Sequence, residues 1–201
     1  MDFKRARNES QIDKRRKDIL KACKKSFISN GYDDTTLLSV ANLTNIGRTT
    51  IYNYFPTKED MFLELFNEEA IRLVHDMENQ YEDVHDDKAD AFYQMLLHIF
   101  HNYKPLFQYH AVYLPRTIDK AEKATMKKFK ESTTTPFKEI FRKWLLLVNP
   151  KLSEEKIELA SKMLFCFLSG LHAASYHDED YEKVCDAFAK SATFLIKNSQ
   201  N

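Results

Sequence analysis

The sequence predicts an all-α protein with a three-helix N-terminal helix-turn-helix domain and a larger helical C-terminal domain. Only 3 of its 201 residues are glycine and 5 are proline, which favours helices joined by short connections. Apolar residues recur at helical spacing along almost the whole length, and no run has the two-residue period of a strand. Two short helical segments meet at a turn containing Gly47, as in a helix-turn-helix.

Three helices are predicted in the first 56 residues. They cover residues 11–30, 37–43 and 48–55. The basic residues before them are either a loose arm or the lead-in to the first helix. Gly31 favours the left-handed conformation that ends a helix. A threonine hydroxyl within Asp33-Asp34-Thr35-Thr36 would cap the second helix, and Gly47 is a tolerated N-cap for the third.

The remaining residues predict a set of longer helices. These cover residues 57–78, 89–103, 105–114, 119–148, 153–176 and 181–197. Thr57 followed by Asp60 resembles a capping box, and Pro136 is expected to interrupt or restart the helix in which it lies. Residues 81–88 and 177–180 are expected to be loops.

The net charge is divided unevenly along the chain. Residues 1–56 hold 11 Lys/Arg and 6 Asp/Glu, a net charge of +5, whereas residues 57–201 hold 19 and 24, a net charge of −5. This division favours a DNA-binding segment joined to a body that does not bind DNA, with ordinary charge scatter as the alternative. The charged N-terminus is no signal peptide and no apolar run is long enough to span a membrane, so a cytoplasmic protein without membrane contact is expected.

Cys23, Cys166 and Cys185 form neither a disulfide framework nor a CxxC pair. We expect three buried, reduced thiols, with a redox sensor as the alternative. His98 and His101 lie three residues apart on a predicted helix, but no further ligand at a compelling spacing supports a metal site. The sequence also contains no Gly-rich phosphate loop, GxSxG or HExxH, so an enzyme is not expected.

A specific combination of residues spans positions 19 to 66, about a quarter of the chain. It consists of Ile19-Leu20-Lys21-Ala22, Phe27, Gly31-Tyr32, Thr35-Thr36, Val40-Ala41, Ile51-Tyr52, Tyr54-Phe55 and Lys58-Glu59. This combination resembles the TetR family of bacterial transcriptional regulators. The resemblance implies a homodimer whose residues 1–56 bind palindromic operator DNA and whose residues 57–201 bind a ligand and dimerise.

The expected DNA-binding residues lie in the second and third helices and at the start of the fourth. They are Thr36, Gly47, Arg48, Thr49, Thr50, Tyr52, Asn53, Tyr54 and Lys58. Thr36 at a helix N-terminus can bind a phosphate. Arg48 and Asn53 can read guanine and adenine, although Arg48 can equally hold a phosphate. Lys58 can neutralise a phosphate, with a solvated surface charge as the alternative.

The resemblance further implies a pocket between helices of the C-terminal domain. Its expected lining is Phe92, Phe100, Tyr103, Phe107, Tyr113, Trp144, Phe167 and His172. These side chains suit an apolar or aromatic small molecule, to which the tyrosine hydroxyls and the histidine nitrogens could offer hydrogen bonds. Each of them can instead be an ordinary core residue. No cofactor is implied.

The last two helices are apolar on more than one face, and in the family the corresponding pair joins two subunits. The expected dimer interface is Met163, Phe167, Gly170, Leu171, Ala174, Phe188, Ala192 and Leu195. The alternative is that these helices complete the core of one chain. The function expected is a repressor released from DNA when a small molecule shifts the helix over residues 57–78. A regulator controlled by a protein partner, or an activator, is the other possibility.

Overall fold

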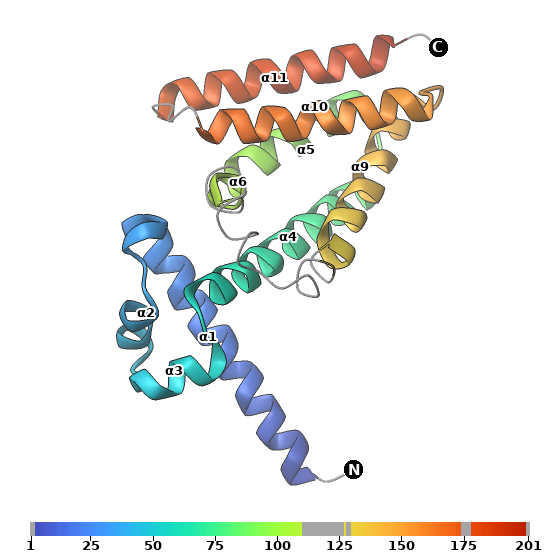
Figure 1. Cartoon of the computed structure of the whole chain (residues 1–201). Coiled ribbons are helices and arrows are strands. Elements are labelled where there is room, and N and C mark those ends of the chain that lie inside the picture. The colour runs from blue at the N-terminus through green and yellow to red at the C-terminus, as the bar shows by residue number, and fades with distance from the viewer. Residues whose placement is uncertain (1–2, 110–126, 128–129, 174–177, 200–201) are drawn as a thin grey trace. The chain divides into compact units, whose positions relative to one another are not determined.

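The computed structural model describes residues 3–109, 127, 130–173 and 178–199, and it confirms an all-α fold (Figure 1). No strand occurs in these ranges. The helices are α1 (Phe3–Asp34), α2 (Leu37–Thr44), α3 (Arg48–Tyr54), α4 (Lys58–Glu82), α5 (Lys88–Asn102), α6 (Lys104–Gln108), the π-helical η2 (Lys130–Thr134), α9 (Thr135–Val148), α10 (Glu154–Ala173) and α11 (Asp178–Asn198). None of the described helices is long and apolar enough to cross a membrane.

The chain divides into two compact units, Met1–Phe66 and Asn67–Asn201. The division therefore falls within α4, whereas the sequence suggested a boundary between residues 56 and 57. The reason is that the first turns of α4 bury Met61 and Phe62 in the N-terminal unit. Later residues of the same helix, such as Met77, belong to the core of the second unit.

Local signals in the sequence place the helices of the N-terminal unit. Because α1 begins at Phe3, the basic residues are the lead-in to the helix and not a loose arm. Gly31 has φ +79° and ψ 175°, a conformation essentially reserved for glycine, and the chain kinks there. Thr36 and Ser39 cap α2 reciprocally: Thr36 Oγ1 accepts the Ser39 N–H at 3.0 Å, and Ser39 Oγ accepts the Thr36 N–H at 2.9 Å.

The core of the N-terminal unit is formed by one face of α1 and residues from the three following helices. Fully buried members include Ile19, Leu20, Cys23, Val40, Ile51, Phe55, Met61 and Phe62. The Phe62 ring makes edge contacts with Phe27 and Tyr32, at centroid distances of 5.5 and 4.5 Å. These contacts fix the start of α4 against α1.

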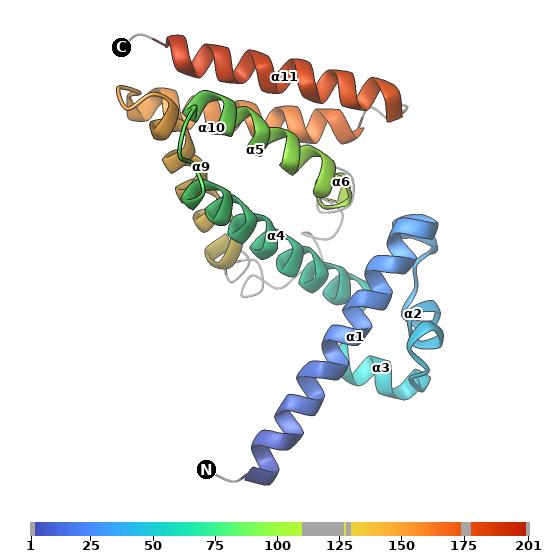
Figure 2. The ribbon, with the colours of Figure 1, turned by 180° about the vertical axis from the view of Figure 1, so that it is seen from behind.

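The C-terminal unit is a helical bundle in which α10 and α11 lie side by side, with α5 next to them (Figure 2). The Phe167 ring of α10 stacks on Phe188 of α11 with a centroid distance of 3.6 Å. Trp144 of α9 is 1% exposed and donates its indole N–H to the Met77 carbonyl of α4 at 3.1 Å. Its ring also meets Tyr81 edge-on, which extends α4 to Glu82, beyond the predicted end at residue 78.

Several boundaries differ from the prediction. Pro136 lies in the first turn of α9, which confirms a helix restart there, and the π-helical turn η2 precedes it. The predicted loop at residues 177–180 is wrong for residues 178–180, since α11 begins at Asp178 and acidic residues suit a first helical turn. Cys23 and Cys185 are buried as predicted, but Cys166 is exposed. The predicted helix end at residue 114 and helix start at residue 119 lie outside the described residues.

Candidate nucleic-acid interface

The turn between α2 and α3 is closed by Asn45, which the sequence reasoning did not single out. Asn45 has φ 52° and ψ 36°, the left-handed conformation that asparagine tolerates at a helix end. The following Ile46 N–H is donated to the Ala41 carbonyl at 3.1 Å. Gly47 has φ −61° and is the N-cap of α3, as predicted, without a side-chain hydrogen bond. Asn45 therefore supplies the tight turn that sequence reasoning assigned to glycine.

The outer face of α3 is polar and open. Its exposed side chains are Arg48, Thr49, Thr50, Tyr52 and Asn53, and Tyr54 is half-buried. Ile51 and Phe55 are 0% exposed and turn the opposite face into the core. Six of the predicted DNA-binding residues thus lie on one short helix, and five of them are exposed.

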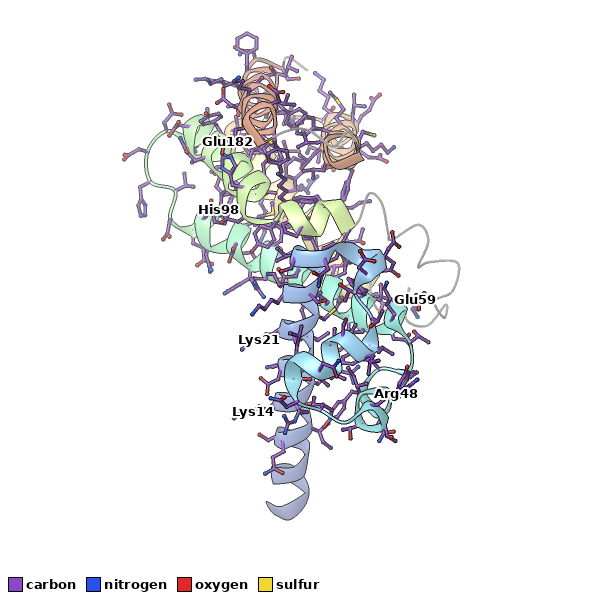
Figure 3. All side chains as sticks on the ribbon, turned by 90° about the vertical axis from the view of Figure 1, so that its left-hand side faces the viewer. Lys14, Lys21, Arg48, Glu59, His98 and Glu182 are labelled. Atoms are coloured by element: carbon purple, nitrogen blue, oxygen red, sulfur yellow. The ribbon has the colours of Figure 1, made fainter. Side chains whose placement is uncertain are left out.

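Positive charge is spread over more than one side of this unit. In Figure 3, Lys14 and Lys21 of α1 lie on the left-hand side of this unit, and Arg48 of α3 lies on its right-hand side. Arg48, Lys14 and Lys21 are all exposed. The basic character of residues 1–56 therefore does not by itself mark the α3 face, whose identity rests on its polar side chains.

Thr36 lies at the N-terminus of α2, where its hydroxyl is already an acceptor for the Ser39 N–H. A threonine hydroxyl retains a proton to donate, so the cap and a phosphate contact are compatible. Thr36 is exposed, as such a contact requires.

Lys58 has intramolecular partners that the sequence reasoning did not foresee. Its Nζ donates to the Tyr32 carbonyl, and to the Asp33 carbonyl at 3.2 Å, at the C-terminal end of α1. It also lies 4.1 Å from the centroid of the Tyr32 ring. Burial lowers the pKa of the Lys58 ammonium, and the nearby Asp33 and Glu59 carboxylates oppose that shift. Lys58 is therefore not the simple solvated charge considered as the alternative.

Arg16 is a second residue that sequence reasoning missed. It forms an ion pair with Glu64 of α4 and donates to the Tyr54 carbonyl at the end of α3. These partners lie 48 and 38 residues away in the chain. No local pattern connects them, so only the packing of α1 against α3 and α4 reveals the cluster.

Most of the predicted pocket residues are buried in the bundle. Phe92, Phe100, Tyr103, Phe107 and Trp144 are buried, and Phe167 is partly exposed. The Tyr103 hydroxyl donates to Asp76 Oδ2 at 2.5 Å. Burial, and to a smaller extent this hydrogen bond, raises the pKa of Tyr103. Tyr113 and the side chain of His172 lie outside the described residues. The ligand pocket stays a prediction.

The predicted interface residues divide into two groups. Met163 and Leu195 are 50% and 57% exposed, and Gly170 is also exposed. Leu171 is buried within its own chain, and Phe167 and Phe188 stack on each other there. Ala192 is half-buried, and Ala174 lies outside the described residues. Further exposed apolar side chains on these helices are Leu159 and Phe194.

His98 takes part in a polar cluster between α4 and α5. Its Nε2 lies 3.5 Å from Asp76 Oδ2, and its Nδ1 lies 3.1 Å from Asn102 Nδ2. Within the described ranges, no group of three or more His, Cys, Asp or Glu side chains could hold a metal ion. His98 and His101 therefore gain no further ligand there.

Comparisons with known proteins agree with this geometry. Residues 19–65 match the family model described as bacterial regulatory proteins, tetR family. The uncharacterized HTH-type transcriptional regulator YhgD of Bacillus subtilis is 50% identical over 52 residues, 26% of this chain and 27% of that protein. The HTH-type transcriptional repressor AcnR of Corynebacterium diphtheriae is 29% identical over 66 residues, 33% of this chain and 35% of that protein.

These sequence matches span only about a quarter to a third of the relatives' length. Similarity over the remaining chain is structural. The transcriptional regulator FadR of Bacillus subtilis, solved in complex with stearoyl-CoA, has a TM-score of 0.65 and 18% identity, covering 92% of this chain and 98% of that one. At this identity the comparison establishes a shared fold.

Proposed function

We propose that this chain, whose residues 19–65 belong to the TetR family of bacterial regulatory proteins, is a transcriptional regulator that binds operator DNA. The observation that carries the proposal is the α3 surface, where five exposed polar or aromatic side chains stand opposite the buried Ile51. This is the geometry of a recognition helix, whose side chains enter the major groove. The proposed role is regulation of transcription and not catalysis.

The side chains of α3 have distinct proposed tasks. Arg48 and Asn53 carry hydrogen-bonding groups that suit guanine and adenine edges. Tyr52, which is 43% exposed, offers a hydroxyl to the DNA backbone. Thr36 at the start of α2 offers a hydroxyl and the end of a helix to a neighbouring phosphate.

A homodimer is proposed because one seven-residue recognition helix reads few base pairs. Two copies related by a two-fold axis would present two such helices to a palindrome. The exposed Met163, Leu195 and neighbouring apolar side chains of α10 and α11 supply a surface for this association.

Control by a small apolar molecule is the proposed means of regulation. In this proposal the ligand-free protein represses transcription, and the ligand releases it from DNA. The aromatic residues of the C-terminal unit and the stearoyl-CoA bound by a protein of the same fold support a ligand with a long apolar chain. The second candidate is control by a protein partner, favoured by the exposed Leu159 and Phe194. Stabilisation against heat by stearoyl-CoA, but not by coenzyme A alone, would favour the first.

The proposal is tested by selecting bound sequences from a random duplex library and titrating the selected duplex at several salt concentrations. A palindrome should emerge, bound with an affinity that falls steeply as salt rises. Arg48→Gln should weaken binding to it roughly tenfold or more. Lys21→Gln removes the same charge from the opposite edge of the unit and should have a much smaller effect.

Equal effects of Arg48→Gln and Lys21→Gln would show that α3 is not the recognition helix. If no sequence is enriched, mass spectrometry of the purified protein shows whether a bound inducer holds it off DNA. A ligand-free protein that selects no duplex would refute the DNA-binding function.

A further inference from the structure

The guanidinium of Arg16 connects three helices of the N-terminal unit. From α1 it forms forked hydrogen bonds to both carboxylate oxygens of Glu64 in α4. Its Nη1 also donates to the Tyr54 carbonyl, at the last residue of α3, at 3.1 Å. The same group lies 4.5 Å from the centroid of the Phe55 ring. One side chain thus links α1, the end of α3 and the start of α4.

The recognition helix α3 has few other anchors. It is seven residues long, and such a short helix is not stable on its own. Ile51 is its one buried residue, and Phe55 follows at its C-cap. At the other end, the Gly47 N-cap has no side-chain hydrogen bond. The direction of α3 therefore depends on Ile51, Phe55 and the Arg16 contact.

The Tyr54 carbonyl is the kind of group that needs an external donor. The last carbonyls of a helix have no intrahelical partner, and a cation there complements the helix dipole. Arg16 meets both needs. Because its fork can hold Glu64 while a third N–H reaches Tyr54, lysine would not replace it.

Glu64 determines where Arg16 can place that third N–H. A bidentate carboxylate fixes the plane of a guanidinium, and Glu64 belongs to α4, which continues beyond the N-terminal unit. The two side chains are 37% and 31% exposed, so neither is fully solvated. The position of Glu64 on α4 relative to α1 therefore determines where Arg16 meets the end of α3.

We propose that Arg16, held by Glu64, is a positioning residue that fixes the C-terminal end of α3 in the orientation required for base contacts. The proposal rests on the DNA-binding function proposed above. Because Arg16 acts through α3 and not on DNA, its loss should reduce discrimination between sequences more than general affinity for DNA. The same reasoning applies to Glu64, which carries the wrong charge for a DNA contact.

The test compares Arg16→Gln, Glu64→Gln and the double variant in the full chain. Arg15→Gln is the matched control, since Arg15 is the adjacent, exposed residue of the same helix and carries the same charge. Binding is titrated with the duplex selected by the wild type and with a scrambled duplex of equal length, each at several salt concentrations. Thermal unfolding confirms that every variant is folded at the titration temperature. If Arg16→Gln is not folded at that temperature, Arg16→Lys takes its place.

Relative to Arg15→Gln, the Arg16→Gln variant should bind the selected duplex roughly tenfold or more weakly, a change within the range of a charged hydrogen bond. Its affinity for the scrambled duplex, and the salt dependence there, should stay close to those of the control. Glu64→Gln should also weaken binding to the selected duplex, although removal of a negative charge alone would strengthen it. The double variant should bind the selected duplex no more weakly than the weaker-binding single variant, because each single substitution already breaks the same Arg16–Glu64 contact.

Two outcomes would overturn the inference. If Arg16→Gln weakens both duplexes equally and lowers the salt slope by about one, Arg16 is a phosphate contact. If Glu64→Gln leaves binding to the selected duplex unchanged or makes it tighter, Glu64 does not hold the recognition helix. Both outcomes need a wild type that selects a duplex, so a failure of the DNA-binding proposal itself is recognised separately.

Discussion

At the scale of single residues, Lys58 has structural contacts beside the phosphate contact proposed for it. A cation at the start of a helix opposes the helix dipole, so α4 itself does not favour a lysine at this position. In the folded chain the ammonium reaches the carbonyls of Tyr32 and Asp33, at the end of α1, where a cation is favourable. Two of its three N–H donors are used there, so the third is compatible with the proposed phosphate contact.

Replacing Lys58 by methionine should therefore destabilise the chain even without DNA. The side-chain length is retained, but the charged hydrogen bonds to the end of α1 are lost, which costs about 1–3 kcal/mol. Urea unfolding of the free protein measures this, with Lys21→Met as a control at an exposed position of α1. Unchanged stability would mean that Lys58 acts only through DNA.

The sequence predicted the exposed face of α3 but not the contacts that hold it. Helical periodicity suffices to separate Ile51 and Phe55 from Arg48, Tyr52 and Asn53, because these positions are neighbours in the chain. The partners of Lys58 and Arg16 are 25 or more residues away, and no periodic pattern reports such pairings.

At the scale of helices, local capping signals were the most informative part of the sequence. Thr36, Gly47 and Pro136 lie where their backbone preferences predicted. Helix boundaries differ from the prediction at the start of α11, at the end of α4 and at both ends of α1, which was predicted over residues 11–30. The α4 helix is extended by packing of Tyr81 on Trp144, a contact between distant segments that outweighs the polar composition there.

Two glycines should respond in opposite ways to replacement by alanine. Gly31→Ala should lower the free energy of unfolding by about 1–3 kcal/mol, since φ is +79° there. Gly170→Ala should raise it by about 0.5–1 kcal/mol, because Gly170 lies in α10 and a Cβ there meets nothing within 4 Å. Both values come from denaturant unfolding at a concentration at which the oligomeric state does not change. Destabilisation by Gly170→Ala would show that another surface lies close to this glycine.

At the scale of the whole molecule, exposed apolar side chains on α10 and α11 mark the surface proposed to join two copies. Met163 and Leu195 are about half exposed and so do not belong to the core of a single chain, whereas Leu171 is buried in that core. Sequence pattern alone could not separate these two groups, because both follow the helical period. The separation requires the positions of α5 and α9 in the bundle.

If the proposed dimer forms through this surface, the double variant Met163→Asp/Leu195→Asp should give folded monomers, because two buried carboxylates would face the partner. Analytical ultracentrifugation gives the oligomeric state, and circular dichroism checks the helix content. Ile28→Asp is the control, since Ile28 is 58% exposed on α1, outside the proposed interface. Persistence of the dimer in the double variant would place the interface elsewhere.

One exposed thiol beside two buried ones gives the chain a single site for a spectroscopic label. Burial raises the pKa of Cys23 to about 12 and that of Cys185 to about 11, so neither offers thiolate to a maleimide near neutral pH. Cys166 is exposed on α10. A fluorophore or spin label attached to the unmutated protein would therefore be confined to one helix, and the distance between labels in two copies could be followed as ligand or DNA is added.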